Sequence, residues 1–374
     1  MAKKLGFGCM RLPLINSADQ TSIDYPQFEK MIDTFIERGF TYFDTAYMYH
    51  DHESERAVKK ALVKRYPRDA YTITTKLPIM GISSKEQMEE IFNEQLEKTG
   101  VDFFDYYWIH NINKNDIDKV REFDAFKFVR EKKKQGLVKH IGFSFHDMPD
   151  MLDEILTEHP EVEYVQLQIN YFDWEADNVK SRENYEVCCR HGKPVIVMEP
   201  VKGGTLATVP AEAEKVMKEM DPSKSVSSWA VRYAASLPGV FMVLSGMSNY
   251  EQLLDNTSYM EDFKELTEEE SEILRTKIVD IIHTAVTVNC TACRYCVDGC
   301  PKQIPIPDYF RLYNGHKQRG GGWHTPEKDE YLELSSSEET GSASDCIRCG
   351  KCENACPQHL TIRKYLQDVA MAFK

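Results

Sequence analysis

The chain has 374 residues, of which 42% are hydrophobic and 28% charged, a composition that supports a full hydrophobic core and argues against a disordered chain. Its 46 basic and 60 acidic residues give a formal net charge of −14, which argues against nucleic acid and against an anionic membrane surface as partners. No apolar run approaches the roughly 18 residues of a membrane span, and the first residues lack the pattern of a secretory signal. We therefore expect a cytoplasmic protein.

Short β-branched or aromatic runs alternate with amphipathic stretches up to about residue 260. Helical spacing of apolar residues recurs between the runs, as in Phe28–Arg38, and runs such as Val195–Met198 are apolar throughout, as in parallel strands covered on both faces. Eight such units predict an α/β fold, a (β/α)₈ TIM barrel over residues 1–265, in preference to an open sheet. The eight predicted strands are Leu5–Met10, Thr41–Ala46, Tyr71–Lys76, Tyr106–His110, His140–Phe145, Tyr164–Asn170, Pro194–Glu199 and Phe241–Gly246.

Four polar residues fall at the ends of the second, third and fourth predicted strands: Asp44, Lys76, His110 and, just beyond the second strand, Tyr49. In a (β/α)₈ barrel the carboxyl ends of the strands form the active-site mouth. Taken singly, each residue has a structural explanation, such as an ion pair between Asp44 and Lys76. Their joint occurrence at consecutive strand ends predicts a catalytic group.

Eight of the eleven cysteines lie in the last 85 residues, in two runs of identical spacing. The runs are Cys290-x₂-Cys293-x₂-Cys296-x₃-Cys300-Pro301 and Cys346-x₂-Cys349-x₂-Cys352-x₃-Cys356-Pro357. Three cysteines at equal gaps let one loop wrap three corners of a cubane iron–sulfur cluster. Zinc is the competing interpretation, but a zinc site needs neither the third equally spaced cysteine nor the trailing Cys-Pro.

The last part of the chain resembles the bacterial-type ferredoxins, in which the fourth cysteine of each run reaches across to the other cluster. This resemblance implies two [4Fe–4S] clusters in a small ferredoxin-like domain over residues 290–374. It assigns Cys290, Cys293, Cys296 and Cys356 to one cluster, and Cys346, Cys349, Cys352 and Cys300 to the other. Residues 266–289 are predicted to form a connecting helix and linker, and residues 319–322 and 335–342 are predicted to be loops.

The first part of the chain resembles the aldo-keto reductases, and the chain as a whole resembles their bacterial iron–sulfur branch. The matching stretches are Leu5–Pro13, Phe43–Tyr49 with Ser54 and Glu55, Thr75-Lys76, His110, Gly136–Ser144 and Gln252–Asn256. The resemblance implies an NAD(P)-dependent oxidoreductase that exchanges hydride between a nicotinamide cofactor and a small-molecule carbonyl or alcohol. The resemblance also implies that Tyr49 is the general acid, that Lys76 and Asp44 lower the pKa of Tyr49, and that His110 orients the substrate.

The resemblance also implies a set of cofactor contacts: Gly8, Cys9, Met10, Ser144, Gln166, Met198, Ser245, Gly246, Met247, Gln252, Asp255 and Asn256. Phe145 stands where the family usually has Asn, and Met198 stands where many members stack a tyrosine on the nicotinamide ring. Members that prefer NADPH carry basic residues at the positions of Gly246 and Gln252, so we expect NAD(H) rather than NADP(H). His50 replaces the usual glycine after Tyr49 and is either a pocket residue or an ordinary loop histidine.

Hydride transfer moves two electrons together, whereas iron–sulfur clusters move one electron at a time, and a flavin commonly converts between the two. The sequence shows no flavin site but does not exclude a flavin. The clusters therefore either exchange electrons with a partner, such as a ferredoxin or another electron carrier, or brace the C-terminal domain. Two alternatives to the enzyme stay open. One is an electron-transfer protein whose barrel binds a nucleotide or a partner without turnover, and the other is a binding subunit with structural zinc. The substrate, the direction of reaction and the oligomeric state cannot be inferred from the sequence.

Overall fold

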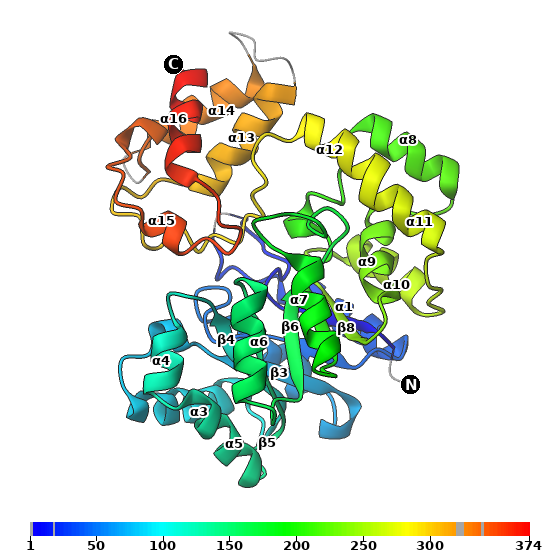
Figure 1. The fold of residues 1–374 in the computed structure, drawn as a ribbon, viewed down its shortest axis with the longest axis vertical. Helices are drawn as coiled ribbons and strands as arrows, with labels where there is room; N and C mark the ends of the chain where they lie inside the picture. Colours follow the sequence, from blue (N-terminus) through cyan, green and yellow to red (C-terminus); the bar gives the residue numbers. More distant parts are fainter. Residues whose placement is uncertain (1–2, 18, 319–324, 338–339) are drawn as a thin grey trace. The chain divides into compact units, whose positions relative to one another are not determined.

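The computed structural model describes residues 3–17, 19–318, 325–337 and 340–374 (Figure 1). By its internal contacts the chain divides into two compact units. The first unit comprises Met1–Ala176, Lys180–Pro200 and Ser227–Thr267, and the second comprises Asp177–Val179, Val201–Val226 and Glu268–Lys374. None of the helices in the described part of the chain has the length and apolar character needed to cross a membrane.

The first unit is built on eight parallel strands that pair in chain order, with β8 closing on β1 to form a barrel. The strands are β1 Leu5–Gly8, β2 Tyr42–Asp44, β3 Thr72–Leu77, β4 Phe104–Ile112, β5 Val138–Phe145, β6 Tyr164–Gln168, β7 Val195–Met198 and β8 Val240–Ser245. Each of the eight predicted strands is present, so the prediction of a (β/α)₈ barrel is confirmed.

Helices surround these strands (Figure 1). They are α1 Tyr25–Glu37, α2 Ser54–Val58, α3 Lys85–Thr99, α4 Ile117–Glu122, α5 Ala125–Lys134, α6 Pro149–Glu158, α7 Ser181–Arg190, α9 Val226–Ser236 and α10 Tyr250–Met260. Helix α1 illustrates why the sequence folds this way. Asp24 caps its first turn by accepting a hydrogen bond from the Gln27 amide, and its apolar stripe packs Phe28 and Phe35 against Phe7 of β1, with ring centroids 5.7 and 5.5 Å apart.

Aromatic side chains fill part of the barrel, where Tyr42, Tyr106 and Trp108 pack with Ile196, Met242 and Leu244. Gly142 of β5 makes room for this layer. A Cβ at this position would lie 2.3 Å from the Tyr164 carbonyl oxygen and 2.6 Å from the Trp108 ring, distances that real Cβ atoms do not reach. The close approach of β5 to its neighbours therefore depends on glycine at position 142.

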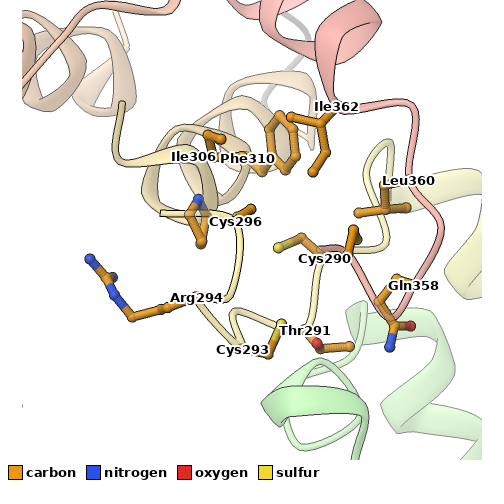
Figure 2. A pocket seen from close by; sticks show the side chains of 12 residues that line it. Cys290, Thr291, Cys293, Arg294, Cys296, Ile306, Phe310, Gln358, Leu360 and Ile362 are labelled. Atoms are coloured by element: carbon orange, nitrogen blue, oxygen red, sulfur yellow. The ribbon is translucent and has the colours of Figure 1, made fainter. Parts of the chain in front are cut away.

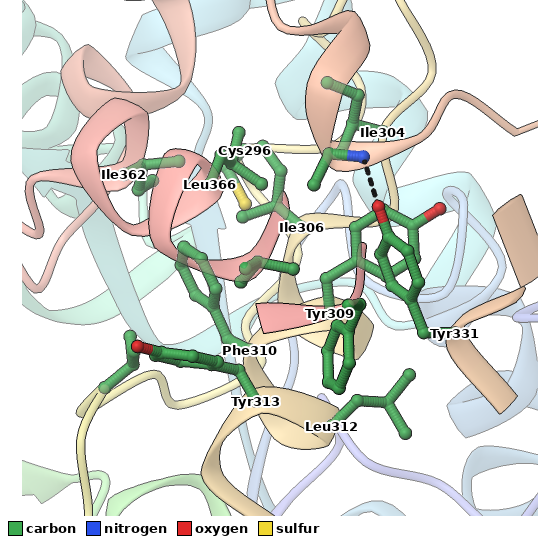
Figure 3. Packing of buried hydrophobic residues seen from close by; sticks show 14 of the residues in the cluster. Cys296, Ile304, Ile306, Tyr309, Phe310, Leu312, Tyr313, Tyr331, Ile362 and Leu366 are labelled. Atoms are coloured by element: carbon green, nitrogen blue, oxygen red, sulfur yellow. Dashed lines mark hydrogen bonds between the residues drawn. The ribbon is translucent and has the colours of Figure 1, made fainter. Parts of the chain in front are cut away.

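The second unit is helical in its described residues. Its helices are α8 Ala211–Met220, α11 Glu268–Ile273, α12 Val279–Ala285, α13 Ile306–Gln318, α14 Pro326–Ser335, α15 Lys351–Asn354 and α16 Ile362–Ala372, and the π-helical turn η5 Leu274–Ile278 joins α11 to α12. Phe310 and Leu312 of α13 belong to one cluster of buried residues with Ile362 and Leu366 of α16, and Figure 3 shows part of this core. The Ala343 amide donates to the Tyr331 hydroxyl at 3.2 Å.

Segments that follow β6 and β7 belong to this second unit and pack against its cysteine loops. The buried Lys202 Nζ lies 3.3 Å from Gln358 Oε1, and Asn178 Nδ2 donates to the Gln358 carbonyl at 2.7 Å. Gly203 has a positive φ of 64°, and a Cβ there would lie 2.1 Å from the Thr291 carbonyl oxygen. The domain boundaries predicted at residues 265 and 289 stay predictions. Of the two predicted loops, residues 319–322 and part of 335–342 lie outside the described residues.

Candidate functional site

The four predicted catalytic residues meet at the carboxyl ends of β2, β3 and β4 in the first unit. The Lys76 ammonium uses its three N–H donors on three oxygens: Asp44 Oδ1 at 2.6 Å, the Thr45 carbonyl at 2.8 Å and Tyr49 Oη at 3.4 Å. Lys76 and Asp44 are buried, so their ion pair is shielded from solvent. The ammonium is thereby fixed beside the phenol oxygen, as the sequence predicts.

His110 completes the group. Its ring lies edge-on to the Tyr49 ring, with centroids 6.0 Å apart and an interplanar angle of 80°. Burial, followed by the charges of Lys76 and His146, holds the pKa of His110 well below its usual range, so the ring is neutral. Its Nδ1 is buried and has no hydrogen-bond partner in the described part of the chain, which leaves this atom for a polar ligand. A neutral imidazole can donate one N–H to a carbonyl oxygen.

The pKa of Tyr49 departs from the sequence expectation. Burial, followed by the negative charge of Asp44, raises the pKa of Tyr49 well above its ordinary value, whereas the sequence argument expects a lowered pKa. Desolvation disfavours the tyrosinate because that anion loses its water, and a sequence does not show how deeply a side chain will be buried. The phenol therefore holds its proton, which is the state that a proton donor needs.

The loop after Tyr49 is held by His50, which has a left-handed φ of 53°. Its Nε2 accepts a hydrogen bond from the Leu12 amide at 3.0 Å, and its Nδ1 donates to the Gln20 carbonyl at 2.9 Å. This pattern requires the neutral tautomer with the proton on Nδ1. Both ring nitrogens of His50 are therefore bonded to backbone groups, and His50 connects the loop after β2 to the loop after β1. The family usually has glycine at this position.

The predicted cofactor contacts gather along neighbouring strands of the same barrel. Ser144 of β5 pairs in register with Gln166 of β6, and Gln168 pairs with Met198 at the end of β7. Gln166 is buried, and its Oε1 has no hydrogen-bond partner among the residues that the structure describes. An orphaned amide oxygen of this kind fits a ligand that presents an N–H donor, as a nicotinamide carboxamide does.

The other predicted contacts lie around β1 and β8. Gly8 packs against the backbone of Ser245 and Gly246, since a Cβ on Gly8 would lie 3.3 Å from the Ser245 carbonyl group. Ser245 accepts a hydrogen bond from Asn256 Nδ2 at 2.6 Å. Gln252 Oε1 accepts from the Ser248 amide at 2.7 Å. The remaining residues of this set, Cys9, Met10, Met247 and Asp255, belong to the same two loops and to helix α10.

Three residues near these positions were not identified from the sequence. The Arg11 stem runs along Gly246, with side-chain carbons 3.1–3.2 Å from the place of a Cβ on residue 246. Glu199 directly follows Met198, has a left-handed φ of 53°, and raises the pKa of Tyr49 through its charge. The Asn111 amide donates to Ser144 Oγ at 2.7 Å. Strained, non-glycine backbone at a strand end often marks a functional site, but φ angles cannot be read from a sequence.

A buried network lies behind Lys76. Glu55 Oε1 accepts from Thr75 Oγ1 at 2.6 Å and from Gln95 Nε2 at 2.8 Å, and Gln95 Nε2 also lies 3.0 Å from the Lys76 carbonyl. Burial raises the pKa of Glu55 to about 7, against the two hydrogen bonds that lower it. Glu55 is therefore protonated over a wide acidic range and supports the backbone of β3.

We expect Glu55 to make the stability of the barrel depend on pH. The folded protein holds the Glu55 proton up to about pH 7, whereas the unfolded chain releases it near pH 4.5. The contribution of this difference to the free energy of unfolding is complete below pH 4.5 and is lost as pH rises through 7. The Glu55→Gln variant should remove this slope, worth at most about 3 kcal/mol, in chemical unfolding followed at pH 4.5 to 8. Glu90→Gln, on the exposed side of the same helix as Gln95, is the control and should keep the wild-type slope.

The cysteines of the second unit line two cavities. The first is lined by Cys290, Cys293 and Cys296 of the first run and by Cys356 of the second run (Figure 2). The second is lined by Cys346, Cys349 and Cys352 together with Cys300 of the first run. The structure thus brings together the two sets of four that the ferredoxin resemblance implies, each with one cysteine from the opposite run.

The thiols of both cavities lie among apolar side chains. Apolar side chains, including Ile306, Phe310 and Ile362, cover the first cavity, and the cavities measure about 310 and 330 Å³ with their openings to solvent. Burial, followed by the neighbouring Cys293 and Cys290, raises the pKa of the Cys296 thiol far above its ordinary value. Among the described residues, no group of three His, Cys, Asp or Glu side chains converges closely enough to hold a single metal ion.

Comparison with known proteins places this arrangement in a family. Residues 4–279 match the aldo/keto reductase family, and residues 289–361 match a 4Fe-4S dicluster domain. The chain therefore belongs to the aldo/keto reductase family, and it is an oxidoreductase with a C-terminal 4Fe-4S dicluster domain. The identification of both families from the sequence is confirmed.

Individual relatives are distant. The chain is 25% identical over 313 residues to the uncharacterized oxidoreductase YqkF of Bacillus subtilis, covering 75% of this chain and 94% of that protein. Its fold is similar to that of the aldo-keto reductase AKR11C1 from Bacillus halodurans, with a TM-score of 0.57, 24% identity and coverage of 74% and 91%. It is also similar to an aldo-keto reductase from Klebsiella pneumoniae solved in complex with NADPH, with a TM-score of 0.59, 19% identity and coverage of 74% and 92%.

Proposed function

We propose that this protein exchanges hydride between a nicotinamide dinucleotide and the carbonyl carbon of a small molecule, with Tyr49 as the proton donor. The observation that carries the proposal is the set of three hydrogen bonds that fixes the Lys76 ammonium between Asp44 and the Tyr49 hydroxyl. An ion pair that served only stability would not need a phenol as the third partner of the lysine.

A bound nicotinamide dinucleotide would supply the hydride in the reducing direction. As the carbonyl carbon accepts hydride, its oxygen gains negative charge, and Tyr49 Oη gives its proton to that oxygen. Lys76 stabilises the tyrosinate that is left, and Asp44 keeps the ammonium charged and in place. His110, neutral and beside Tyr49, donates a hydrogen bond to the same oxygen and sets its direction. Oxidation of an alcohol uses the same groups in reverse order.

The residues that would hold the dinucleotide are those predicted from the sequence, with Gln166 and Ser144 at the carboxamide end and the loop after β8 at the adenosine end. Gln166 supports this assignment because its buried Oε1 lacks an internal partner. Met198 would pack against the nicotinamide ring through its thioether. Gly8 lets β1 lie close to the backbone of Ser245 and Gly246, and Gly246 makes room for the Arg11 stem, so the two loops that would hold the adenosine end pack against each other.

We further propose that NADH is preferred over NADPH, because residues 246 and 252 are not basic and a 2′-phosphate needs a cation. NADH should bind at least about tenfold more tightly than NADPH in fluorescence titrations, a difference of about 1.4 kcal/mol. Gln252→Arg should strengthen NADPH binding and leave NADH binding unchanged, and Glu251→Gln on the same helix is the control.

Arg11 is the residue that could make NADPH, and not NADH, the preferred dinucleotide in that experiment. Its stem lies against Gly246, so its guanidinium is the cation that could replace the missing basic residues. If the wild type bound NADPH more tightly than NADH, and Arg11→Gln abolished that difference, the proposed preference for NADH would be wrong.

The two sets of four cysteines would each hold one [4Fe–4S] cluster. We propose that the clusters exchange single electrons with a small carrier protein, such as a ferredoxin. An electron-transfer protein without carbonyl turnover is the second candidate function, favoured by Phe145 and Met198 at positions where the family usually has Asn and Tyr. It predicts reducible clusters together with a barrel that binds the dinucleotide and turns nothing over.

One anaerobic experiment separates the candidates. Cluster-loaded protein is mixed with NADH or NADPH and a panel of aldehydes, ketones and quinones, and dinucleotide oxidation is followed by absorbance. Product formation that depends on a carbonyl supports the reductase. Binding of the dinucleotide without oxidation across the whole panel supports the second candidate. The absorption spectrum of the same sample reports the clusters and any flavin.

A further inference from the structure

The two cysteine-lined cavities of the second unit differ in the charge around them. Three basic side chains, Lys302, Lys351 and Arg363, line the second cavity, and no acidic side chain is among its lining residues. Arg294 is the one charged residue that lines the first cavity, and it pairs with Asp308 at 3.2 Å. The excess of basic residues is notable in a chain with a net charge of −14.

Nearby acidic groups offset this charge only in part. Glu353 bonds Arg363, with Oε2 2.6 Å from Nη2. Hydrogen bonds from Ser342, followed by the charge of Lys302, lower the pKa of Asp345. Asp345 also accepts hydrogen bonds from the Ser342 amide and hydroxyl, both at 2.8 Å. Arg348, which is exposed and lies between Cys346 and Cys349 in the second run, adds one further basic residue among those that the structure describes.

An exposed apolar residue lies within the same loop. Ile347 is 59% exposed, although it stands between two of the cysteines that line the second cavity, Cys346 and Cys349. Each cavity has one buried cysteine, Cys296 or Cys352, but only the second has an exposed one, Cys349, among the cysteines described as lining it. A cluster in the second cavity would therefore lie close to the surface, beneath an apolar residue with a basic rim. Protein–protein docking sites commonly combine an apolar centre with a charged rim of this kind.

We propose that the surface formed by Lys302, Ile347, Arg348, Lys351 and Arg363, here called the basic cluster face, docks an acidic one-electron carrier protein of the ferredoxin type. The inference rests on the proposed cluster binding and not on the proposed carbonyl chemistry. The reduced carrier loses one electron to the cluster held by Cys300, Cys346, Cys349 and Cys352, which gains it. No bond forms or breaks, and no proton moves. Opposite charges steer the two proteins together and raise the association rate.

Stopped-flow measurement of cluster reduction tests this inference without dinucleotide or substrate. The probe is a chemically reduced, acidic plant-type [2Fe–2S] ferredoxin mixed with the cluster-loaded protein at low ionic strength. The triple variant Lys302→Glu, Arg348→Glu and Lys351→Glu should lower the second-order rate constant by about 10- to 100-fold and abolish its dependence on salt. Ile347→Ser should lower the rate constant at low and high salt alike, because it removes apolar contact and no charge.

The matched control is the triple variant Lys215→Glu, Lys277→Glu and Lys317→Glu. These exposed residues also lie in the second unit, outside the lining of both cavities, and the substitutions change the net charge by the same amount. Iron content should be the same in wild type and in both triple variants, and the rate of reduction by the small cation methyl viologen radical should agree within about twofold.

Three results would overturn the inference. An unchanged rate with ferredoxin in the basic-face variant would show that the carrier does not dock there. An equal loss in the control triple would show an effect of net charge alone. A shifted midpoint potential of the cluster, together with slower reduction by methyl viologen, would show that the basic residues set the redox properties of the cluster and do not dock the carrier. Failure of carbonyl reduction leaves this measurement unaffected, so the two proposals can fail separately.

Discussion

Replacing Tyr49 with phenylalanine should lower kcat/KM for carbonyl reduction by about 10³-fold, the middle of the range for a positioned proton donor. The substitution removes the atom that we propose as the proton donor and leaves the ring packed against His110. Dinucleotide affinity should stay within about twofold, because the loss is confined to the transition state. Steady-state kinetics with the substrate found in the carbonyl panel, together with fluorescence titration of the dinucleotide, measure both quantities.

The same loop supplies a matched control for this prediction. Tyr47 donates its hydroxyl hydrogen bond to Glu94 Oε2 at 2.8 Å, outside the catalytic group. Tyr47→Phe removes an identical atom two residues away and should leave kcat/KM within about threefold. Carbonyl reduction by Tyr49→Phe at a rate close to that of the wild type would contradict the assignment of Tyr49, even though the chain would still belong to the family.

The raised pKa of Tyr49 has a consequence for the pH profile of the wild type. A proton donor works only while it is protonated, and burial holds this phenol protonated well beyond pH 10. The rate of carbonyl reduction should therefore show no fall from loss of the Tyr49 proton between about pH 6 and 9. Lys76 contributes by stabilising the tyrosinate when the proton has left, and not by making the resting phenol acidic.

The strands of the barrel could be predicted from the sequence because their signal is local. Runs such as Val195–Met198 are apolar on consecutive residues, and the glycine that ends a helix, such as Gly100 with its φ of 72°, stands directly after the last helical residue. The ends of the strands then bring Asp44, Lys76 and His110 together, because in a closed barrel all carboxyl ends lie on one face.

Features that depend on contacts between distant segments were not predicted. The loop after β7 belongs to the second unit, and its Lys202 meets Gln358, 156 residues further along the chain. Arg11 reaches Gly246 from the opposite end of the barrel sequence. The direction of the pKa shift of Tyr49 was wrong for the same reason, since desolvation is set by every segment that covers the hydroxyl. Neither periodicity nor motif spacing contains this information.

Replacing single cysteines should have the second large effect, a loss of iron and sulfide that follows the pairing of the cysteines across the two runs. If each cavity holds one cluster, Cys356→Ala and Cys293→Ala should each lose the same cluster, and Cys300→Ala and Cys349→Ala should each lose the other. Each single variant should therefore retain about half of the wild-type iron and sulfide after anaerobic purification. Cys189→Ala, at an exposed cysteine outside both cavities, is the control and should retain all of it.

Double variants then decide between pairing across the runs and pairing within each run. Cys293→Ala combined with Cys356→Ala removes two ligands of one cavity and should lose no more iron than either single variant. Cys293→Ala combined with Cys300→Ala removes one ligand from each cavity and should lose nearly all of it. The reverse pattern would mean that each run holds its own cluster. Iron analysis and low-temperature paramagnetic resonance of the reduced protein distinguish the two patterns, because the effects of ligands to one cluster are not additive.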